Sequence, residues 1–277
     1  MDASVFQFFE AIRCPFLTVI FSVLSFFGEG AFVAVITIAL LWLFDDDETP
    51  FVLLFSVALN SFLKFTAARP RPYVADVVTR VEIDSFLVST LDLKPYESFP
   101  SGHSQSLSSL LFSHAFHKKN LKKGLLFALF CIGVGFSRLY LGVHYPTDVI
   151  AGLCIGFLSA AIWHTVKVRF PRAFSYSLYP AAAASMIPLL FGASESYIQA
   201  AGLFAGLAVS LPFCTYLPKR KSTFPKRFLR IPAGALLAGC AFSLSFALPA
   251  GFMPAVCFFV AIAALPAARA VFYALKI

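Results

Sequence analysis

Three short segments of this sequence carry charged and hydroxyl side chains at the ends of long apolar runs, where such side chains are costly. They are residues 64–72, with the sequence KFTAARPRP, residues 100–103, with the sequence PSGH, and residues 137–148, with the sequence SRLYLGVHYPTD. Ionisable residues beside apolar runs of this length are functional-site candidates by default. We therefore expect the three segments to meet in one site.

The basic residues of these segments predict a binding site for a phosphoryl group. Lys64, Arg71 and Arg138 supply three cations, which repel one another unless an anion lies between them. A phosphoryl group fits, because guanidinium groups match its oxygens and Lys adds a point charge. Ser101 and Gly102 precede an apolar run, so their backbone N–H groups can point at the anion with a helix dipole behind them.

Two histidines and one carboxylate supply the reactive groups. Asp148 follows His144 by four residues. A carboxylate that accepts a hydrogen bond from one ring nitrogen fixes the tautomer and leaves the other nitrogen free to attack. The other histidine, His103, can then protonate the leaving alkoxide. This combination predicts phosphoryl transfer to a histidine nucleophile.

In order along the chain, the segments match K-x6-R-P, P-S-G-H and S-R-x5-H-x3-D. The sequence therefore resembles the type 2 phosphatidic acid phosphatase superfamily, which includes vanadium haloperoxidases and glucose-6-phosphatase, over residues from about 15 to 165. The resemblance implies that His144 forms a phosphohistidine, that Asp148 orients it and that His103 is the general acid. It also implies that the phosphoryl oxygens are bound by Lys64, Arg71, Ser101, Gly102 and Arg138.

Composition places these residues in a membrane protein. Of 277 residues, 59% are hydrophobic and only 13% are charged, whereas a soluble domain is nearer a quarter charged. We predict an all-α, polytopic membrane helix bundle. The net charge of +8 comes from basic residues in short loops, so we interpret it as a topology signal and expect no nucleic-acid partner.

Apolar runs predict about nine spans, or ten if the N-terminal segment crosses the membrane. The stretch at 14–27 is too short to span comfortably, so residues 5–27 are expected to form an interfacial or re-entrant helix. We expect a membrane phosphatase core over residues 1–170 and a four-helix membrane extension over residues 171–277. The predicted spans are 26–44, 50–66, 103–116, 124–141, 147–165, 173–193, 197–217, 231–249 and 251–268.

The placement of Lys and Arg predicts which way the site faces. Fifteen of the 22 basic residues fall in one set of alternate loops and at the C-terminal end, and the seven others, Lys64, Arg71 and Arg138 among them, fall on the opposite side. Cytoplasmic loops carry the excess of Lys and Arg. We therefore expect an integral protein of a bacterial inner membrane with its active site facing the periplasm or exterior.

Polar residues at positions that the three motifs do not specify are expected to have structural rather than catalytic roles. Arg69, Arg80 and Lys94 are expected to be surface anchors whose charged ends reach water. The serines between residues 104 and 113 are expected to serve helix packing. The six cysteines stand singly, without metal-ligand spacing. We expect neither a metal nor a cofactor.

A site at the membrane surface favours hydrolysis of a lipid phosphate or lipid pyrophosphate, such as phosphatidic acid or polyprenyl pyrophosphate. One alternative is a sugar-phosphate phosphatase resembling glucose-6-phosphatase. Another is a lipid transporter that uses the site for binding only, although binding alone needs no His–Asp pair. A haloperoxidase would need bound vanadate, and membrane embedding argues against it. The expected partners are the lipid bilayer and a lipid phosphate, and a homodimer is left open.

Overall fold

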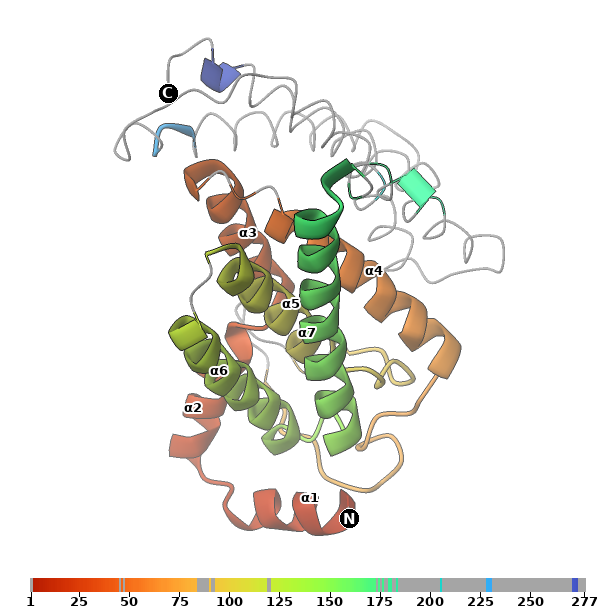
Figure 1. Cartoon of the computed structure of the whole chain (residues 1–277). Coiled ribbons are helices and arrows are strands. Elements are labelled where there is room, and N and C mark those ends of the chain that lie inside the picture. Colours follow the sequence, from red (N-terminus) through yellow and green to blue (C-terminus); the bar gives the residue numbers. More distant parts are fainter. Residues whose placement is uncertain are drawn as a thin grey trace, which may run out of the picture. The chain divides into compact units, whose positions relative to one another are not determined.

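The computed structural model describes residues 2–44, 46, 48–83, 90, 93–118 and 121–172, together with 174, 176, 179–180, 183, 205, 228–230 and 271–273. In this part of the chain all the regular elements with assigned bounds are helices (Figure 1), which confirms the all-α prediction there. The predicted spans beyond residue 172 lie almost entirely outside the described residues. The helices are α1 (Asp2–Ala11), α2 (Pro15–Phe26), α3 (Gly30–Phe44), α4 (Glu48–Ala67), α5 (Gly102–His117), α6 (Leu121–Tyr140) and α7 (Pro146–Arg169).

Three of the described helices are long and apolar enough to cross a membrane, namely α4, α7 and the Lys122–Tyr140 part of α6. They correspond to the predicted spans 50–66, 147–165 and 124–141. The outward side chains of α6 are large and apolar, as a hydrocarbon environment requires. Its exposed residues include Leu125, Leu126, Leu129, Ile132 and Phe136. Helix α5 has 16 residues and α3 has 15, so both are shorter than a full span.

The N-terminal segment forms two helices where the sequence predicted one interfacial or re-entrant helix. Pro15 begins α2 at a position that suits a residue without an N–H group. Figure 1 shows α1 running across the ends of α6 and α7. Thr18 Oγ1 lies 2.8 Å from the Tyr140 hydroxyl, and Phe21 stacks on the Tyr140 ring at 4.4 Å. These contacts fix the first half of α2 against the C-terminal end of α6. The turn that follows α2 packs against the middle of α6, where the rings of Phe27 and Phe130 lie 5.1 Å apart.

Two glycines bring α7 close to α5. A Cβ on Gly156 would lie 2.4 Å from a backbone oxygen of α5, and a Cβ on Gly152 would lie 2.6 Å from the backbone oxygen of Ser101. Ser108 Oγ donates across the contact to the carbonyl of Leu153 at 2.9 Å. Small residues allow such close approach between membrane helices, which agrees with the packing role expected for the α5 serines.

The helices belong to two compact units. All the candidate site residues lie in the first unit. In the second unit, Lys167 Nζ pairs with the buried carboxylate of Glu48 at 3.1 Å. The predicted boundary near residue 170 stays a prediction. The first unit comprises Met1–Thr37 and Leu59–His164, and the second comprises Ile38–Ala58 and Thr165–Ile277.

The close α5–α7 contact predicts a steep cost for a single methyl group. Gly156→Ala should lower the stability of the detergent-solubilised protein by about 1–3 kcal/mol, because the added Cβ meets backbone rather than a flexible side chain. Gly124→Ala in α6 is the matched control, since nothing lies within 4 Å of a Cβ there. It should be neutral or stabilising by up to about 1 kcal/mol. Thermal melting of both variants checks this, and equal melting temperatures would contradict it.

Candidate active site

The end of α6 turns the chain so that His144 points back into the bundle. The N–H of Gly142 donates to the carbonyl of Leu139 at 3.0 Å, and the N–H of Val143 donates to the carbonyl of Arg138 at 3.2 Å. This pair of bonds is a Schellman motif, which needs a left-handed residue. Gly142 supplies it with a φ of +72°. The next residue after the motif is His144.

The start of α7 places Asp148 beside that turn. Pro146 is the first residue of the helix, where a missing N–H group costs nothing. Asp148 Oδ2 accepts a hydrogen bond from the backbone N–H of Tyr145 at 2.9 Å. A carboxylate in the first turn that reaches back to the residue before the helix satisfies one of the unpaired N–H groups there. Asp148 is therefore held in one position by the helix start.

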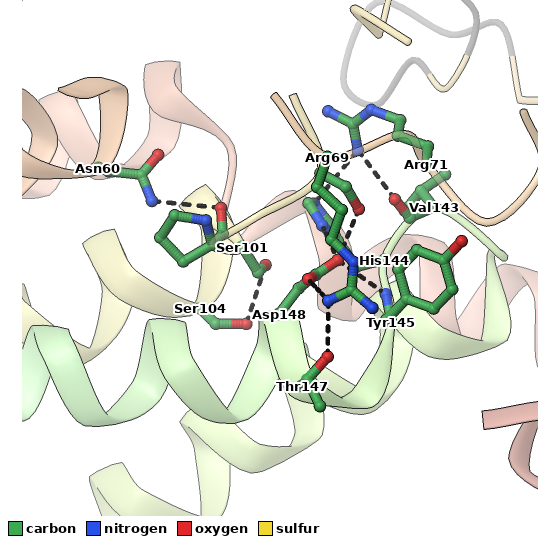
Figure 2. A network of polar contacts seen from close by, with 12 residues as sticks. Asn60, Arg69, Arg71, Ser101, Ser104, Val143, His144, Tyr145, Thr147 and Asp148 are labelled. Atoms are coloured by element: carbon green, nitrogen blue, oxygen red, sulfur yellow. Dashed lines mark hydrogen bonds and ion pairs between the residues drawn. The ribbon is translucent and has the colours of Figure 1, made fainter. Parts of the chain in front are cut away.

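The other two segments come to the same place (Figure 2). Lys64 is in the last turn of α4, and Arg71 follows that helix. Ser101 precedes α5, which begins at Gly102. The backbone N–H of Ser101 donates to the backbone carbonyl of Asp148 at 3.0 Å. Of the two N–H groups expected to face an anion, the one on Ser101 is therefore already used to join α5 to α7.

His144 is buried, with 2% of its side chain exposed. Arg71 Nη1 lies 3.3 Å from His144 Nε2. Since a guanidinium only donates, Nε2 must carry the lone pair and Nδ1 the proton. Nδ1 lies 3.6 Å from Asp148 Oδ2, which is longer than a hydrogen bond. The expected partners, His144 and Asp148, therefore lie side by side, but the distance between these two atoms is too long for a hydrogen bond.

The surroundings keep His144 neutral. Burial, and then the positive charges of neighbours such as Arg71 and Arg138, hold the pKa of His144 well below its ordinary value. A neutral imidazole with a lone pair on Nε2 is a competent nucleophile at neutral pH.

Arg69 is not the surface anchor that the sequence suggested. Its Nη1 pairs with Asp148 Oδ1 at 2.7 Å and donates to Thr147 Oγ1 at 2.7 Å. Its guanidinium also lies 4.0 Å from the centre of the Tyr145 ring. Asp148 Oδ2 is approached from the other side by Ser98 Oγ at 2.5 Å. Arg69 therefore neutralises the charge of Asp148 and helps to fix its orientation.

The three cations predicted to bind phosphate differ in their contacts with the rest of the protein. Arg71 donates from Nε to the carbonyl of Lys94 at 2.8 Å and from Nη1 to the carbonyl of Val143 at 2.9 Å. Arg138 is 1% exposed and donates from Nη1 to Ser25 Oγ. Within the described part of the chain, its buried Nε has no hydrogen-bond partner. Lys64 Nζ lies 3.8 Å from where a Cβ on Gly102 would be.

His103, the second residue of α5, contacts a residue that the sequence argument did not consider. Its Nε2 lies 2.9 Å from Glu29 Oε1. Asn60 is a second such residue, since its Nδ2 donates to the carbonyl of Pro100 at 3.3 Å and to Gln105 Oε1 at 2.8 Å. Glu29 and Asn60 are polar residues in largely apolar stretches, and this feature of the sequence could have marked both as site candidates. Among the described residues, no group of three His, Cys, Asp or Glu side chains could hold a metal ion.

Known proteins with similar sequences indicate the family of this chain. Residues 49–172 match the family model of the PAP2 superfamily. The chain is 30% identical over 149 residues to the undecaprenyl-diphosphatase BcrC of Bacillus subtilis, covering 51% of this chain and 72% of that protein. It is 44% identical over 78 residues to the bacitracin transport permease protein BcrC of Bacillus licheniformis, covering 26% and 36%. It is 36% identical over 106 residues to a lipid A 1-phosphatase of Rhizobium johnstonii, covering 38% and 41%. The matched regions thus span about two fifths or less of the last two relatives.

The charge environment of His144 predicts that its imidazole does not titrate in the ordinary range. Its isotope-labelled NMR signal, assigned with His144→Gln, should stay unchanged between about pH 8 and pH 6, because burial and nearby cations oppose protonation. After unfolding, the same signal should titrate at about pH 6.5. A folded-state midpoint at or above that value would show that the cations do not surround the ring.

The Arg69–Asp148 pair predicts a loss of both stability and turnover in Arg69→Met. Removing one partner of a buried pair costs about 3–5 kcal/mol. Since Arg69 is 31% exposed, we expect roughly 1–2 kcal/mol. Misplacement of Asp148 should also lower kcat by about 10- to 100-fold.

The matched control for that variant is Arg80→Met. Arg80 also lies over a tyrosine ring, that of Tyr73, and donates to the carbonyl of Thr90 at 2.9 Å, but its carboxylate partner Glu82 is 74% exposed. The control should lose less than about 1 kcal/mol and keep its turnover. Melting curves and steady-state kinetics on both variants make the comparison, and equal losses would return Arg69 to the role of a surface anchor.

Proposed function

Since this chain belongs to the PAP2 superfamily, we propose that it is a membrane phosphatase that hydrolyses a lipid phosphate or lipid pyrophosphate through a phosphohistidine on His144. The observation that carries this proposal is the arrangement of cations around a neutral, buried His144. Arg71 contacts the Nε2 atom of the ring, and the buried Nε of Arg138 has no partner in the described structure. A bound phosphoryl group would supply the missing acceptor and balance the cations.

The proposed reaction has two steps. In the first, Arg71 Nη1 gives up its contact with His144 Nε2 for a phosphoryl oxygen, and the freed Nε2 lone pair forms a bond to phosphorus. The bond from phosphorus to the leaving oxygen breaks at the same time, and that oxygen takes a proton from His103. In the second, water gives a proton to His103 and attacks phosphorus. The P–N bond then breaks, and its electron pair returns to Nε2. Inorganic phosphate and the dephosphorylated lipid are the products.

The remaining residues stabilise charge and position. Lys64, Arg71, Arg138, the N–H of Gly102 and the hydroxyl of Ser101 would bind the phosphoryl oxygens, whose charge is spread outward in the transition state. The N–H of Ser101 is not part of this set, because it donates to the carbonyl of Asp148. Asp148 would accept a hydrogen bond from His144 Nδ1–H as positive charge develops on the imidazole ring. Because three cations already meet the phosphoryl charge, we propose that the reaction needs no metal ion or cofactor.

Two findings favour a lipid substrate. Three described helices are long and apolar enough to cross a membrane, and the candidate site lies at their ends, where a lipid can present its phosphate while its tail stays in hydrocarbon. Two of the similar proteins are also named for lipid substrates, one as an undecaprenyl-diphosphatase and one as a lipid A 1-phosphatase. A sugar phosphate is the alternative, and it has no comparable support.

We also propose the topology that the basic residues suggest. The chain would have about nine spans, with four of them after residue 170. The active site would face away from the cytoplasm of a bacterial inner membrane, because fifteen of the 22 Lys and Arg residues fall on the other side. A homodimer is compatible with this arrangement.

Phosphate release from a substrate panel tests the function. The purified full chain in detergent should release inorganic phosphate from phosphatidic acid or a polyprenyl pyrophosphate in the presence of a chelator. Vanadate should inhibit as a transition-state mimic, and His144→Ala should abolish release although the protein still melts cooperatively.

Three results would contradict the proposal. Turnover of a matched sugar phosphate alone would favour the sugar-phosphate alternative. Lipid binding without release would favour a transporter. Loss of activity in chelator that magnesium restores would contradict metal-free catalysis.

A further inference from the structure

The turn after α2 reaches the candidate site from outside the three motif segments. Ser25, at the end of α2, accepts a hydrogen bond from the buried guanidinium of Arg138. Four residues later, Glu29 lies 2.9 Å from His103 Nε2, with the two side chains 27% and 15% exposed. The turn therefore contacts both a proposed phosphate-binding residue and the proposed general acid.

Gly28 shows how closely this turn is fitted to His103. A Cβ on Gly28 would lie 2.7 Å from His103 Cβ and 2.8 Å from His103 Cδ2. No side chain larger than hydrogen fits there without moving the ring. The imidazole thus packs against the backbone at Gly28 while its Nε2 contacts the carboxylate of Glu29.

The contact between Glu29 and His103 also fixes which ring nitrogen carries a proton. An ionised carboxylate only accepts hydrogen bonds, so Nε2 must be the N–H nitrogen that donates to Glu29. In neutral His103 the lone pair is then on Nδ1, and in the protonated ring Nδ1 carries the second proton. Nδ1 is therefore the nitrogen left to exchange a proton with substrate and water.

Building on the proposed phosphatase function, we propose that Glu29 is a positioning residue for the general acid, acting through His103. Its carboxylate holds the Nε2–H bond throughout the reaction and stabilises the imidazolium before the proton leaves. In the first step the Nδ1 proton passes to the leaving oxygen as the P–O bond breaks. In the second step the Nδ1 lone pair takes a proton from the attacking water. Glu29 itself keeps its charge and loses or gains no proton.

Other charges near His103 do not substitute for Glu29. Arg138 and Lys64 are cations, so they oppose protonation of the ring. Asp148 is engaged by Arg69, Ser98 and the Tyr145 N–H. Among the described residues, Glu29 is the carboxylate in hydrogen-bonding contact with His103.

The test compares two leaving groups and uses a double-mutant cycle. A lipid phosphate monoester releases an alkoxide that needs a proton, whereas p-nitrophenyl phosphate releases a phenolate that hardly does. His103→Ala sets the reference, with a loss of roughly 100- to 10,000-fold on the lipid and a clearly smaller loss on the aryl phosphate. Glu29→Gln keeps the shape and removes the charge, so it should lose about 10-fold or more on the lipid but little on the aryl phosphate.

In the His103→Ala background, Glu29→Gln should have no further effect, because a residue that acts through another is not additive with it. Glu82→Gln, in an exposed loop position, is the matched control and should be unchanged. Equal losses on both substrates, or an additive loss in the double variant, would show that Glu29 only supports the fold. If His103→Ala and wild type behave as expected while Glu29→Gln does not, the phosphatase function stands and this inference alone is wrong.

A second test uses the protein with Glu29 in place, so it does not depend on whether Glu29→Gln folds. The nitrogen chemical shifts of His103, assigned with His103→Gln, distinguish the two neutral tautomers. We expect the Nε2–H form. The Nδ1–H form would overturn the role given to Glu29, whether or not the enzyme is active.

Discussion

The buried carboxylate of Asp148 is the group on which the geometry of the whole site depends. It caps α7 through the Tyr145 N–H, receives Ser98 from the loop before α5 and pairs with Arg69 from the segment after α4. The carbonyl of the same residue receives the N–H of Ser101. Segments that are up to 79 residues apart are thus tied to one residue, and each of them also carries a proposed phosphate-binding group.

The pairing with Arg69 explains how one site can hold a carboxylate and still bind an anion. If Asp148 were unpaired, its charge would compensate the cations that a phosphoryl group needs. With Arg69 taking up that charge, Lys64, Arg71 and Arg138 keep theirs in a poorly solvated environment, where electrostatic attraction is strong. The same cations keep His144 unprotonated, so one arrangement would serve both the proposed phosphate binding and the proposed attack.

Local spacing predicted well where the motif residues stand relative to the helix ends, because the turn at Gly142 and the helix starts at Gly102 and Pro146 depend on neighbouring residues. The four-residue spacing of His144 and Asp148 put both at one turn, and the apolar runs at 50–66, 124–141 and 147–165 became α4, α6 and α7. Contacts between distant segments were not predictable in this way. Arg69 looked like a surface anchor, Glu29 attracted no attention, and the Ser101 N–H was assigned to an anion although it bonds to another helix. The break between α1 and α2 was missed although Glu10, Arg13 and Pro15 interrupt the apolar residues there.

The central claim is that His144 carries the phosphoryl group between substrate and water, and covalent trapping tests it most directly. Wild-type protein mixed with a radiolabelled lipid phosphate and quenched rapidly under alkaline conditions should retain one acid-labile phosphoryl group, located by peptide mass spectrometry on His144. His144→Ala should retain none. Label on His103, or full turnover with no trapped label on any histidine at the shortest times, would contradict the claim.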